Sequence, residues 1–479
     1  MSKPSPESGN PLPRNPPLPF RRGEGWGEGS VPPPDSVVPA GGDKSPAAAH
    51  KSEVILVLCF LAVIAGVPVT QTCLELARHE RVQATDIFRY EPPAKNLRQF
   101  EHTLEEKAWF QQHLRPPLQR FLFATLHDTG AKGVLGRNRW LFYRPDLRYL
   151  VEPDRLEADA SGSKWVQPPD RSTHRESVEK AILRFRDQLK ERGITLVVMP
   201  VPGKPSVYPD RVTGRALGKE GQFRSPTLEL LDALQRRGVA TVDLFAAFQA
   251  VRESGGLTKN PGELYLAHDT HWTPLGAQTA AQAVAAKLSA MNLVPAAKKE
   301  FRTQGIAIAR WGDILDMMQI PGLRGAFAAE TVQCVQVLDQ ALGPMVPAAS
   351  DRPGTYCYPG QQAAVLVLGD SFCRIYQYAE PQSLGEMRAS GATARPSELG
   401  AKRLLPGSAG FVSHLALALK SPVDAIVSDG GAATDVRRKL STNPEILESK
   451  QVVVWEFVER DIALGAQGWE DVALPRKLQ

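Results

Sequence analysis

An unbroken apolar segment at residues 363–368, Ala-Ala-Val-Leu-Val-Leu, ends at Gly369. A run this short, closed by a glycine, is typical of a strand that is buried on both faces. Two further apolar runs lie at residues 194–201 and 452–457. Strands that are buried on both faces need helices on both sides, so these runs predict a parallel sheet in an α/β domain.

Helical patterns alternate with these apolar runs. The predicted helices cover residues 177–192, which Gly193 ends, 226–237, 273–290, where Thr273-Pro274 supplies a cap and a first-turn proline, and 411–419. Shorter strands are expected at residues 241–243 and 425–427. The predicted fold is therefore α/β, with a mostly parallel sheet flanked by helices and a ligand site at the carboxyl ends of the strands.

Ser371 follows the first apolar run directly, in the sequence Gly369-Asp370-Ser371. If a helix begins there, the serine hydroxyl lies near free backbone N–H groups and the positive end of a helix dipole, which suits a developing oxyanion. The same sequence is also compatible with an ordinary loop in which Asp370 or Ser371 is only a helix cap.

A serine hydroxyl needs an imidazole to accept its proton, and the imidazole needs an acceptor on its other nitrogen. Asp269 and His271 are two residues apart, so in an extended stretch their side chains point to the same side. We therefore predict a catalytic triad of Ser371 as nucleophile, His271 as general base and Asp269 as its orienting group. The Ser371 hydroxyl is expected within about 4 Å of a His271 ring nitrogen.

A metal site is the alternative interpretation of this segment. The side chains of His268, Asp269 and His271 are of the types that bind zinc or iron. No further ligand is apparent in the sequence and no Cys-x-x-Cys pair occurs. We expect no metal, and the serine mechanism needs no nucleotide or other cofactor.

Four other residues are candidates for substrate binding. Trp272 is either a platform for an acyl group or sugar, or a packing residue. Lys204, in a Pro-Gly-Lys-Pro turn, either meets an anionic sugar or is an ordinary exposed lysine. Arg374 and Tyr376 follow the serine closely, and one helical turn would place Arg374 near the nucleophile.

Residues 54–69 carry no charge and, with their neighbours through Cys73, approach the roughly 20 residues that cross a bilayer. No small-x-small cleavage site follows, so an uncleaved signal anchor is predicted, with a buried helix of a soluble domain as the alternative. The preceding segment is crowded with Pro, Gly and Ser, which predicts a disordered tail. The net charge of +5 is small for a chain of this length, and the sequence contains no basic stripe with interleaved aromatic residues. Both observations argue against nucleic-acid binding.

These features divide the chain into five expected segments. They are a disordered cytoplasmic tail (1–52), a transmembrane signal anchor (53–73), a helical linker (74–135), a catalytic domain (136–465) and a C-terminal tail (466–479). Cys334 and Cys357 are far enough apart to close a loop in an oxidising compartment, although their spacing is not diagnostic of a disulfide.

Several blocks in one order resemble the SGNH-like O-acetyltransferases of exopolysaccharide assembly, the alginate O-acetyltransferase AlgJ/AlgX family. The blocks are residues 136–143, 201–209, 269–273, 312–313, 369–372 and 455–460. The Asp and His precede the Ser, unlike in SGNH hydrolases generally, and no Gly-x-Asn-Asp block supplies a side-chain oxyanion donor. The Ser371 backbone N–H is the only group that we can name from the sequence as a donor to the oxyanion. The chain ends soon after the last block, without a carbohydrate-binding module, so the resemblance is closer to AlgJ.

The resemblance implies an SGNH-hydrolase-like fold and a membrane-anchored O-acetyltransferase. Its catalytic domain is expected in the periplasm, on a single-pass anchor in the inner membrane. The expected acceptor is an exopolysaccharide or cell-wall polysaccharide, and the expected donor partner is a membrane-bound O-acyltransferase that passes acetyl groups outward. A carbohydrate esterase with the same triad and a non-catalytic scaffold of a polysaccharide-export complex remain open.

Overall fold

The structure is a computed structural model. It describes residues 46–82, 109–151, 171–218, 224–255, 262–294, 298–320, 322–339, 343–344, 363–377, 380–381, 404–405 and 407–475. The chain divides into two compact units, Met1–Thr85 and Asp86–Gln479, and each is described by itself. Cys357 and most of the predicted N-terminal tail lie outside the described residues.

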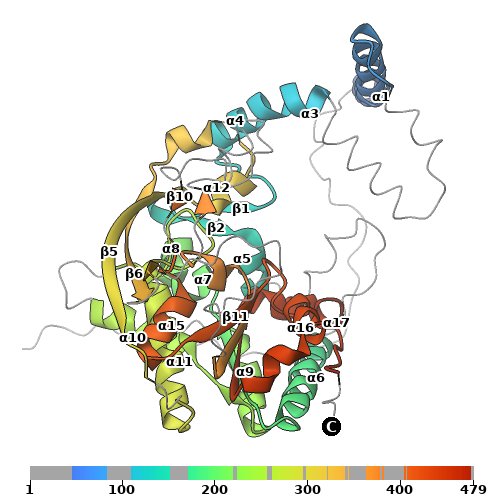
Figure 1. Cartoon of the computed structure of the whole chain (residues 1–479). Coiled ribbons are helices and arrows are strands. Elements are labelled where there is room, and N and C mark those ends of the chain that lie inside the picture. Colours follow the sequence, from blue (N-terminus) through green and yellow to red (C-terminus); the bar gives the residue numbers. More distant parts are fainter. Residues whose placement is uncertain are drawn as a thin grey trace, which may run out of the picture. The chain divides into compact units, whose positions relative to one another are not determined.

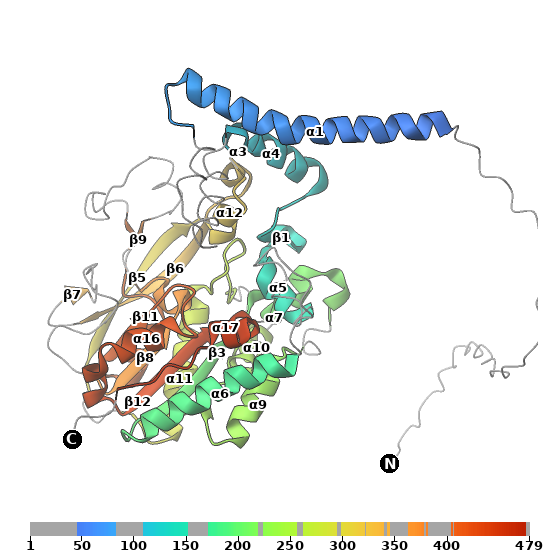
Figure 2. The same cartoon turned by 90° about the vertical axis from the view of Figure 1, so that its right-hand side faces the viewer.

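The first unit contains the long helix α1 (Pro46–Ala77), drawn in blue in Figure 2. Its segment Val54–Ala77 has a mean hydropathy of 2.5 and is mostly exposed, although Glu75 is buried, and by length and composition it could cross a membrane. The helix begins before residue 53 and continues past residue 73, where the anchor was expected to end. Pro68 lies inside the helix without ending it.

The second unit is built on a five-stranded parallel sheet with the order β11-β8-β12-β3-β4. The strands are β3 (Thr195–Val201), β4 (Ala240–Thr241), β8 (Val365–Gly369), β11 (Val423–Val427) and β12 (Val452–Val458). The parallel α/β sheet predicted from the apolar runs is confirmed. The last strand of the chain, β12, lies at the centre of the sheet, between β8 and β3.

Helices cover both faces of this sheet, as the fully apolar strands require. The helices are α6 (Arg171–Lys190), α9 (Thr227–Arg236) and α16 (Asp435–Ser441) on one face, and α10 (Leu244–Gly255), α11 (Pro274–Ala290) and α15 (Phe411–Leu419) on the other. Alternate residues of β3 follow this division, since Val197 and Met199 pack on the α11 side and Leu196 and Val198 on the α6 side. Figure 2 looks onto the face that α6 covers.

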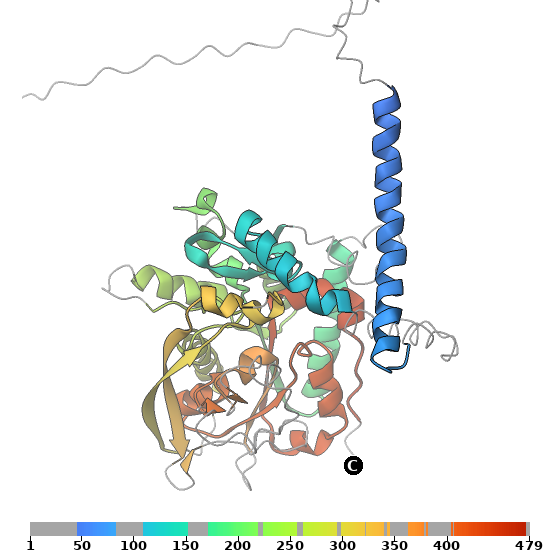
Figure 3. The ribbon, with the colours of Figure 1, turned by 90° about the horizontal axis from the view of Figure 1, so that it is seen from above.

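A second, antiparallel sheet was not predicted. It contains β5 (Phe301–Arg310), β6 (Glu330–Asp339) and β7 (Gly343–Pro344), and β5 and β6 form a long curved ribbon at one edge of the unit (Figures 1 and 3). The first half of β5 is polar, and only the short run Ile306–Ala309 in its second half is apolar, which explains why the sequence contains no clear strand signal here. This ribbon matters because the end of β5 approaches the candidate site.

The remaining elements are short. They are the hairpin β1 (Gly133–Leu135) and β2 (Leu141–Tyr143), the pair β9 (Glu380–Pro381) and β10 (Leu404–Leu405), the helices α3 (Trp109–His113), α4 (Arg115–Leu126), α5 (Arg144–Val151), α7 (Lys204–Val207), α8 (Pro209–Val212), α12 (Asp313–Met317), α13 (Ser371–Arg374) and α17 (Gly465–Gly468), and the 3₁₀ turns Arg137–Arg139, Gly214–Ala216, Leu323–Ala326, Pro444–Ser449 and Glu459–Leu464.

The globular unit extends beyond the expected boundaries 136 and 465. At its start, β1 pairs with β2, and at its end Trp469 is buried against the rings of Trp455 and Phe457, with centroids 5.4 and 4.8 Å apart. The Trp469 Nε1–H donates a hydrogen bond to the Asp461 carbonyl oxygen (2.8 Å). Trp469 and Leu474 are therefore core residues, within the segment 466–479 that was expected to be a C-terminal tail. A single tryptophan among polar residues gives no periodic signal, which explains the difference.

Replacing Trp469 by alanine should destabilise the second unit by about 3–5 kcal/mol, because a large buried ring and its hydrogen bond are lost. The control Leu464→Ala removes a nearby side chain that is 46% exposed, and should change the free energy of unfolding by less than about 0.5 kcal/mol. Urea unfolding followed by circular dichroism measures both. Equal effects of the two substitutions would show that the C-terminal segment does not pack as described.

Candidate active site

Ser371 lies just after the carboxyl end of strand β8, which neighbours the central strand β12. Gly369 ends the strand, and Ser371 is the first residue of the single-turn helix α13. Asp370 caps this helix, because its Oδ1 accepts a hydrogen bond from the Phe372 N–H (2.8 Å). A helix does begin at the serine, and Asp370 is its cap. Among the described residues the Ser371 N–H has no hydrogen-bond acceptor, so it remains a donor for an oxyanion.

A glycine is required at position 369 because the side chains of Cys373 and Glu456 lie close to its backbone. A Cβ atom at this position would lie 2.4 Å from the Cys373 Sγ and 2.5 Å from the Glu456 Oε2. Real Cβ atoms do not approach other atoms this closely, so a side chain at position 369 would push the turn away from its neighbours. The glycine of the Gly-Asp-Ser sequence thus fits the packing beneath the serine.

Asp269 and His271 lie in a tight loop whose ends meet at a bridge between Tyr265 and Trp272. The segment bends and is not extended, contrary to the expectation. The Asp269 Oδ1 accepts hydrogen bonds from both the His271 backbone N–H (3.0 Å) and the His271 Nδ1 (2.6 Å). A short aspartate side chain readily turns back onto the amide two residues later, which brings the pair together without a strand.

The His271 Nε2 lies 2.8 Å from the Ser371 Oγ, although the two residues are 100 positions apart in sequence. Asp269 and His271 are buried, and Ser371 is partly exposed. With the Nδ1 proton shared with Asp269, the Nε2 accepts a hydrogen bond from the serine hydroxyl. The three residues predicted from the sequence form one continuous hydrogen-bonded chain.

A second carboxylate supports this chain. Asp313, at the start of α12, accepts hydrogen bonds from the Thr270 N–H (2.7 Å) and hydroxyl (2.6 Å), and its Oδ2 lies 3.5 Å from the His271 Nδ1. The other oxygen of Asp269 accepts hydrogen bonds from the Asp313 N–H (3.3 Å) and the Arg310 Nε (3.4 Å). Asp269 therefore has partners on both oxygens, which fixes its orientation toward the imidazole.

The segment that carries Asp313 can approach the loop of Asp269 and His271 only because residue 312 is a glycine. A Cβ atom there would lie 1.9 Å from the His268 carbonyl oxygen and 2.5 Å from the Asp269 backbone nitrogen. Gly312 and Asp313 were among the family blocks in the sequence, but no role was assigned to them. The structure shows that the glycine permits the contact and that Asp313 uses it.

These charges change the protonation of the site. Burial alone would lower the pKa of His271, but the charge and hydrogen bond of Asp269 outweigh it, and the pKa is raised. Burial alone would raise the pKa of Asp269, but the interactions with His271 and Arg310 hold it well below its usual range. Burial and the charge of Asp269 raise the pKa of Asp313 to about 6. The arrangement stabilises an imidazolium at position 271.

Glu456, in the central strand β12, supports the turn that carries the serine. Its Oε2 accepts hydrogen bonds from the Asp370 N–H (2.9 Å) and the Cys373 thiol (3.2 Å). The Val458 N–H of the same strand donates to the Asp370 Oδ2 (3.3 Å). Glu456 is completely buried, and burial together with the charge of Asp370 raises its pKa well above the ordinary value. Strand β12 thus holds the turn that carries Ser371 in place.

Glu459 supports the loop after β3 in the same way. Its carboxylate accepts hydrogen bonds from the Gly203 N–H (2.7 Å) and the Thr227 hydroxyl (2.9 Å), and also from Ser206 and Ser225. Burial raises the pKa of Glu459 to about 6, against the effect of these donors. Residues 455–460 formed one of the blocks that carry the family resemblance. The structure shows that Glu456 and Glu459 in this block hold the turn of Ser371 and the loop after β3.

Lys204 is buried, not exposed as the turn sequence suggested. Its Nζ donates hydrogen bonds to the carbonyl oxygens of Leu141 (2.6 Å), Ala267 (2.8 Å) and Asp269 (2.9 Å), and it lies 5.1 Å from the centre of the Trp140 ring. Burial lowers its pKa to about 8, so it is still protonated near neutral pH. Lys204 holds the Asp269 loop in place and does not face a sugar, because the loop after β3 turns inward.

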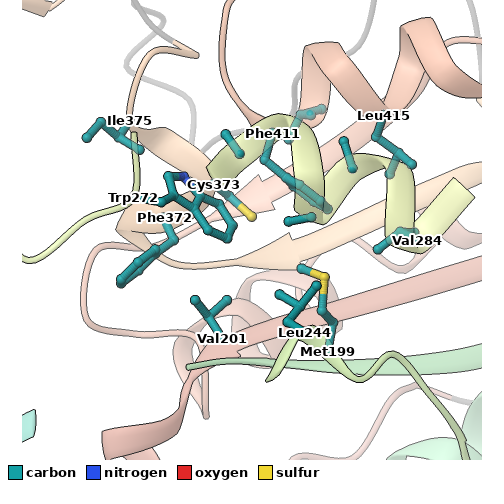
Figure 4. Packing of buried hydrophobic residues seen from close by; sticks show 14 of the residues in the cluster. Met199, Val201, Leu244, Trp272, Val284, Phe372, Cys373, Ile375, Phe411 and Leu415 are labelled. Carbon is teal, nitrogen blue, oxygen red and sulfur yellow. The ribbon is translucent and has the colours of Figure 1, made fainter. Parts of the chain in front are cut away.

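Two more predicted substrate residues are internal. Trp272 is 0% exposed and packs against the rings of Phe372 and Phe411, with centroids 5.1 and 5.9 Å apart (Figure 4). Tyr376 is buried, and its hydroxyl donates to the Trp272 carbonyl oxygen (3.2 Å). Trp272 is therefore a packing residue. Both support the backbone that carries His271 and do not present a surface to a substrate.

Arg374 is partly exposed one helical turn after the serine, as expected, and its Nε lies 2.7 Å from the Asp429 Oδ1. Its role toward a substrate stays a prediction.

The contact of Arg310 with Asp269 was not predicted from the sequence, because a single arginine at the end of a strand carries no signal. Glu456 had a detectable signal, since a carboxylate inside an otherwise apolar strand is rarely tolerated without partners.

The structure does not favour the predicted metal alternative. His268 points to another group, since its Nδ1 lies 3.4 Å from Glu330 and its ring contacts Phe327 (4.8 Å between centroids). Asp269, His271 and Asp313 could by distance share an ion, with ligand atoms within 4.8 Å of one another. However, the Nδ1 of His271 and both oxygens of Asp269 are engaged in the hydrogen bonds described above.

Comparisons with known proteins agree with the resemblance seen in the sequence. The family profile "SGNH hydrolase-like domain, acetyltransferase AlgX" matches residues 134–390. The chain is 24% identical over 339 residues to "Probable alginate O-acetylase AlgJ" of Pseudomonas syringae pv. tomato, which covers 70% of each chain. It is 26% identical over 342 residues to the protein of the same name from Pseudomonas putida, covering 70% of this chain and 71% of that one.

Among solved structures, the O-acetyltransferase domain of Pseudomonas putida AlgJ aligns with 70% of this chain and 92% of that chain, at 22% identity and a TM-score of 0.44. The family match covers more than half of the 479 residues and includes the segments that carry Asp269, His271 and Ser371. The resemblance is confirmed: the chain belongs to the AlgX family of SGNH hydrolase-like acetyltransferases.

Proposed function

We propose that this protein transfers acetyl groups to hydroxyls of an extracellular polysaccharide through an acetyl-serine intermediate. The observation that carries the proposal is the continuous hydrogen-bonded chain from Asp269 through His271 to Ser371. A serine with this support is activated for attack on an acyl carbon, and family membership directs the chemistry toward acetyl transfer.

In the first step, the His271 Nε2 accepts the Ser371 proton while the Oγ attacks the carbonyl carbon of an acetyl donor. The Ser371 N–H donates to the developing oxyanion, and Asp269 stabilises the imidazolium. His271 then returns the proton to the departing group of the donor. The products are acetyl-Ser371 and the deacylated donor.

In the second step, a sugar hydroxyl takes the place of the donor. His271 accepts its proton as the sugar oxygen attacks the acetyl-serine carbonyl. The tetrahedral intermediate collapses with the Ser371 Oγ as leaving group, and His271 returns the proton to it. The enzyme is restored, and the sugar carries the acetyl ester.

The relatives named alginate O-acetylase AlgJ support a polysaccharide as acceptor. The apolar helix α1 supports anchoring in the inner membrane by a single span, with the second unit as a catalytic domain in the periplasm. Cytoplasmic acetyl donors do not cross a bilayer, so the donor side requires a membrane-bound O-acyltransferase partner. No cofactor enters either step.

The triad is tested with a chromogenic acetyl ester. Ser371→Ala should lower turnover at least about 1000-fold and abolish the acetyl adduct seen by mass spectrometry, and His271→Ala should do nearly the same, because the hydroxyl loses its base. Asp269→Ala should retain more activity, and double variants should lose little more than single ones. The control Ser441→Ala, at the end of α16, should keep full activity.

An oligosaccharide acceptor then separates transfer from hydrolysis. A transferase should produce an acetylated sugar and turn over faster when the acceptor is added. An esterase should instead remove acetate from an acetylated oligosaccharide, and a scaffold should do neither. Full activity of Ser371→Ala would rule out the proposed intermediate.

The raised pKa of His271 predicts the pH profile of the reaction. His271 acts as a base only when neutral and its pKa is raised, so kcat/KM should fall with decreasing pH at a midpoint above 6.5. Asp313→Asn removes a negative charge 3.5 Å from the Nδ1, which should lower this pKa and move the midpoint to lower pH by up to about one unit. Asp316→Asn, on the same helix but paired with Arg324, should leave the midpoint in place. An unchanged midpoint in Asp313→Asn would contradict the assigned electrostatics.

The substitution Lys204→Met tests the role of the buried lysine. Three buried carbonyl groups lose their donor, at about 1–3 kcal/mol each, so the free energy of unfolding should fall by at least about 3 kcal/mol. Ester turnover should also fall in the molecules that remain folded, because the Asp269 loop loses its support. Lys180→Met replaces an exposed lysine within α6 and should change neither quantity. Unfolding energies equal to that of the control would contradict the role of Lys204.

A further inference from the structure

Helices α3 and α4 form one nearly continuous helix. The Leu114 N–H donates to the Phe110 carbonyl oxygen (2.9 Å), and the Leu118 N–H donates to the Leu114 carbonyl oxygen (3.2 Å), so the hydrogen-bond pattern continues across the junction. Phe110, Leu114, Leu118 and Phe121 are spaced by four, four and three residues. This spacing places them on one side of the helix, as an apolar stripe.

The apolar stripe faces outward. Phe110, Leu114, Leu118 and Phe121 are 38%, 45%, 49% and 62% exposed, and α4 has no buried residue. A surface helix of a soluble domain normally turns such a stripe toward the core. Figures 1 and 2 show α3 and α4 at the end of the second unit away from α9 and α11. Contiguous exposed apolar surface of this kind marks an interaction site.

The other side of α4 attaches the helix to its own domain. The Phe123 ring lies against the Phe327 ring, with centroids 6.3 Å apart. Phe123 is two residues from Phe121 and therefore points to a different side of the helix. The outward direction of the apolar stripe is thus fixed by the attachment of α4 to the Phe327 segment.

The composition of the helix fits a membrane surface. Residues 109–126 contain no Asp or Glu, but they contain Arg115, Arg120 and several aromatic residues. An apolar face of Phe and Leu with arginines and no acidic residue is typical of helices that lie in the interface of an anionic bilayer. A face for a basic protein partner would need acidic residues, which this segment lacks.

The chain also brings a bilayer within reach. The proposed anchor helix ends at Ala77 and α3 begins at Trp109. The connecting residues 78–108 can span up to roughly 100 Å. A domain tethered in this way stays close enough to the membrane for a weakly binding face to remain bound, because the tether raises its effective concentration.

We propose that the apolar stripe of α3 and α4 lies on the surface of the membrane in which α1 is anchored, and that it prefers anionic lipid headgroups. The stripe is a second membrane contact, in addition to the span, and it fixes one face of the catalytic unit against the bilayer. The proposal rests on the anchor but not on acetyl transfer, since no residue of the stripe belongs to the catalytic chain.

The test uses the full chain in vesicles of phosphatidylcholine and phosphatidylglycerol that carry quencher groups on their lipids. Cys59, Cys73 and Cys357 are replaced by serine, and a fluorophore is attached through Leu114→Cys or, as a control, through Leu217→Cys, a site that is 52% exposed outside the stripe. Lipid quenching should be several-fold stronger at position 114. Leu118→Asp with Phe121→Asp should reduce it to the control level, and Leu217→Asp should not.

Omitting phosphatidylglycerol should weaken the contact severalfold, because the helix carries arginines and no acidic residue. The Asp variants should hydrolyse the acetyl ester normally in detergent, which shows that they are folded. Equal quenching at positions 114 and 217 would overturn the proposal, and so would a label at 114 that is shielded in detergent without lipid, because protein would then cover the stripe. Loss of the whole protein from vesicles in a carbonate wash would refute the anchor and this proposal together, while leaving the catalytic proposal intact.

Discussion

The site depends on the position of β12 at the centre of the parallel sheet, between the strands that lead to Ser371 and to Lys204. From this one strand and the turn after it, Glu456 binds the nucleophile turn and Glu459 binds the loop after β3. Lys204, held by that loop, in turn binds the carbonyl oxygen of Asp269. Each member of the triad is thus connected to the same rigid strand or to a neighbour of it.

The buried charges of the site also set the pKa values of its carboxyl groups. The interactions with His271 and Arg310 hold the pKa of Asp269 well below its usual range, whereas burial and the charge of Asp370 raise the pKa of Glu456 well above its ordinary value. A carboxyl group whose pKa is raised by folding stabilises the fold below its unfolded pKa and loses that contribution as pH rises through the folded pKa. A carboxyl group whose pKa is lowered does the reverse. The site therefore shifts the pKa values of neighbouring carboxyl groups in opposite directions.

The features predicted from the sequence were local ones. The apolar runs and their glycine stops gave the strands, and the two-residue spacing of Asp269 and His271 gave half of the hydrogen-bonded chain. The roles of Lys204, Glu456 and Trp469 were not predictable in this way, because each depends on partners brought together by the fold. Lys204 illustrates the reason: its partners Leu141 and Ala267 are each 63 residues away in sequence, and a Pro-Gly-Lys-Pro turn looks the same whether it faces water or the core.

The order of the strands along the chain also determines when the enzyme becomes competent. The sheet cannot be completed until its last strand in sequence inserts between two strands that were synthesised long before it. Until then the serine turn lacks its carboxyl support, and β8 and β3 have no common neighbour. A nascent chain that has delivered Asp269, His271 and Ser371 but not β12 therefore still lacks the strand that holds the turn of Ser371 and the loop of Lys204, so the hydrogen-bonded chain can form only after β12 has been synthesised.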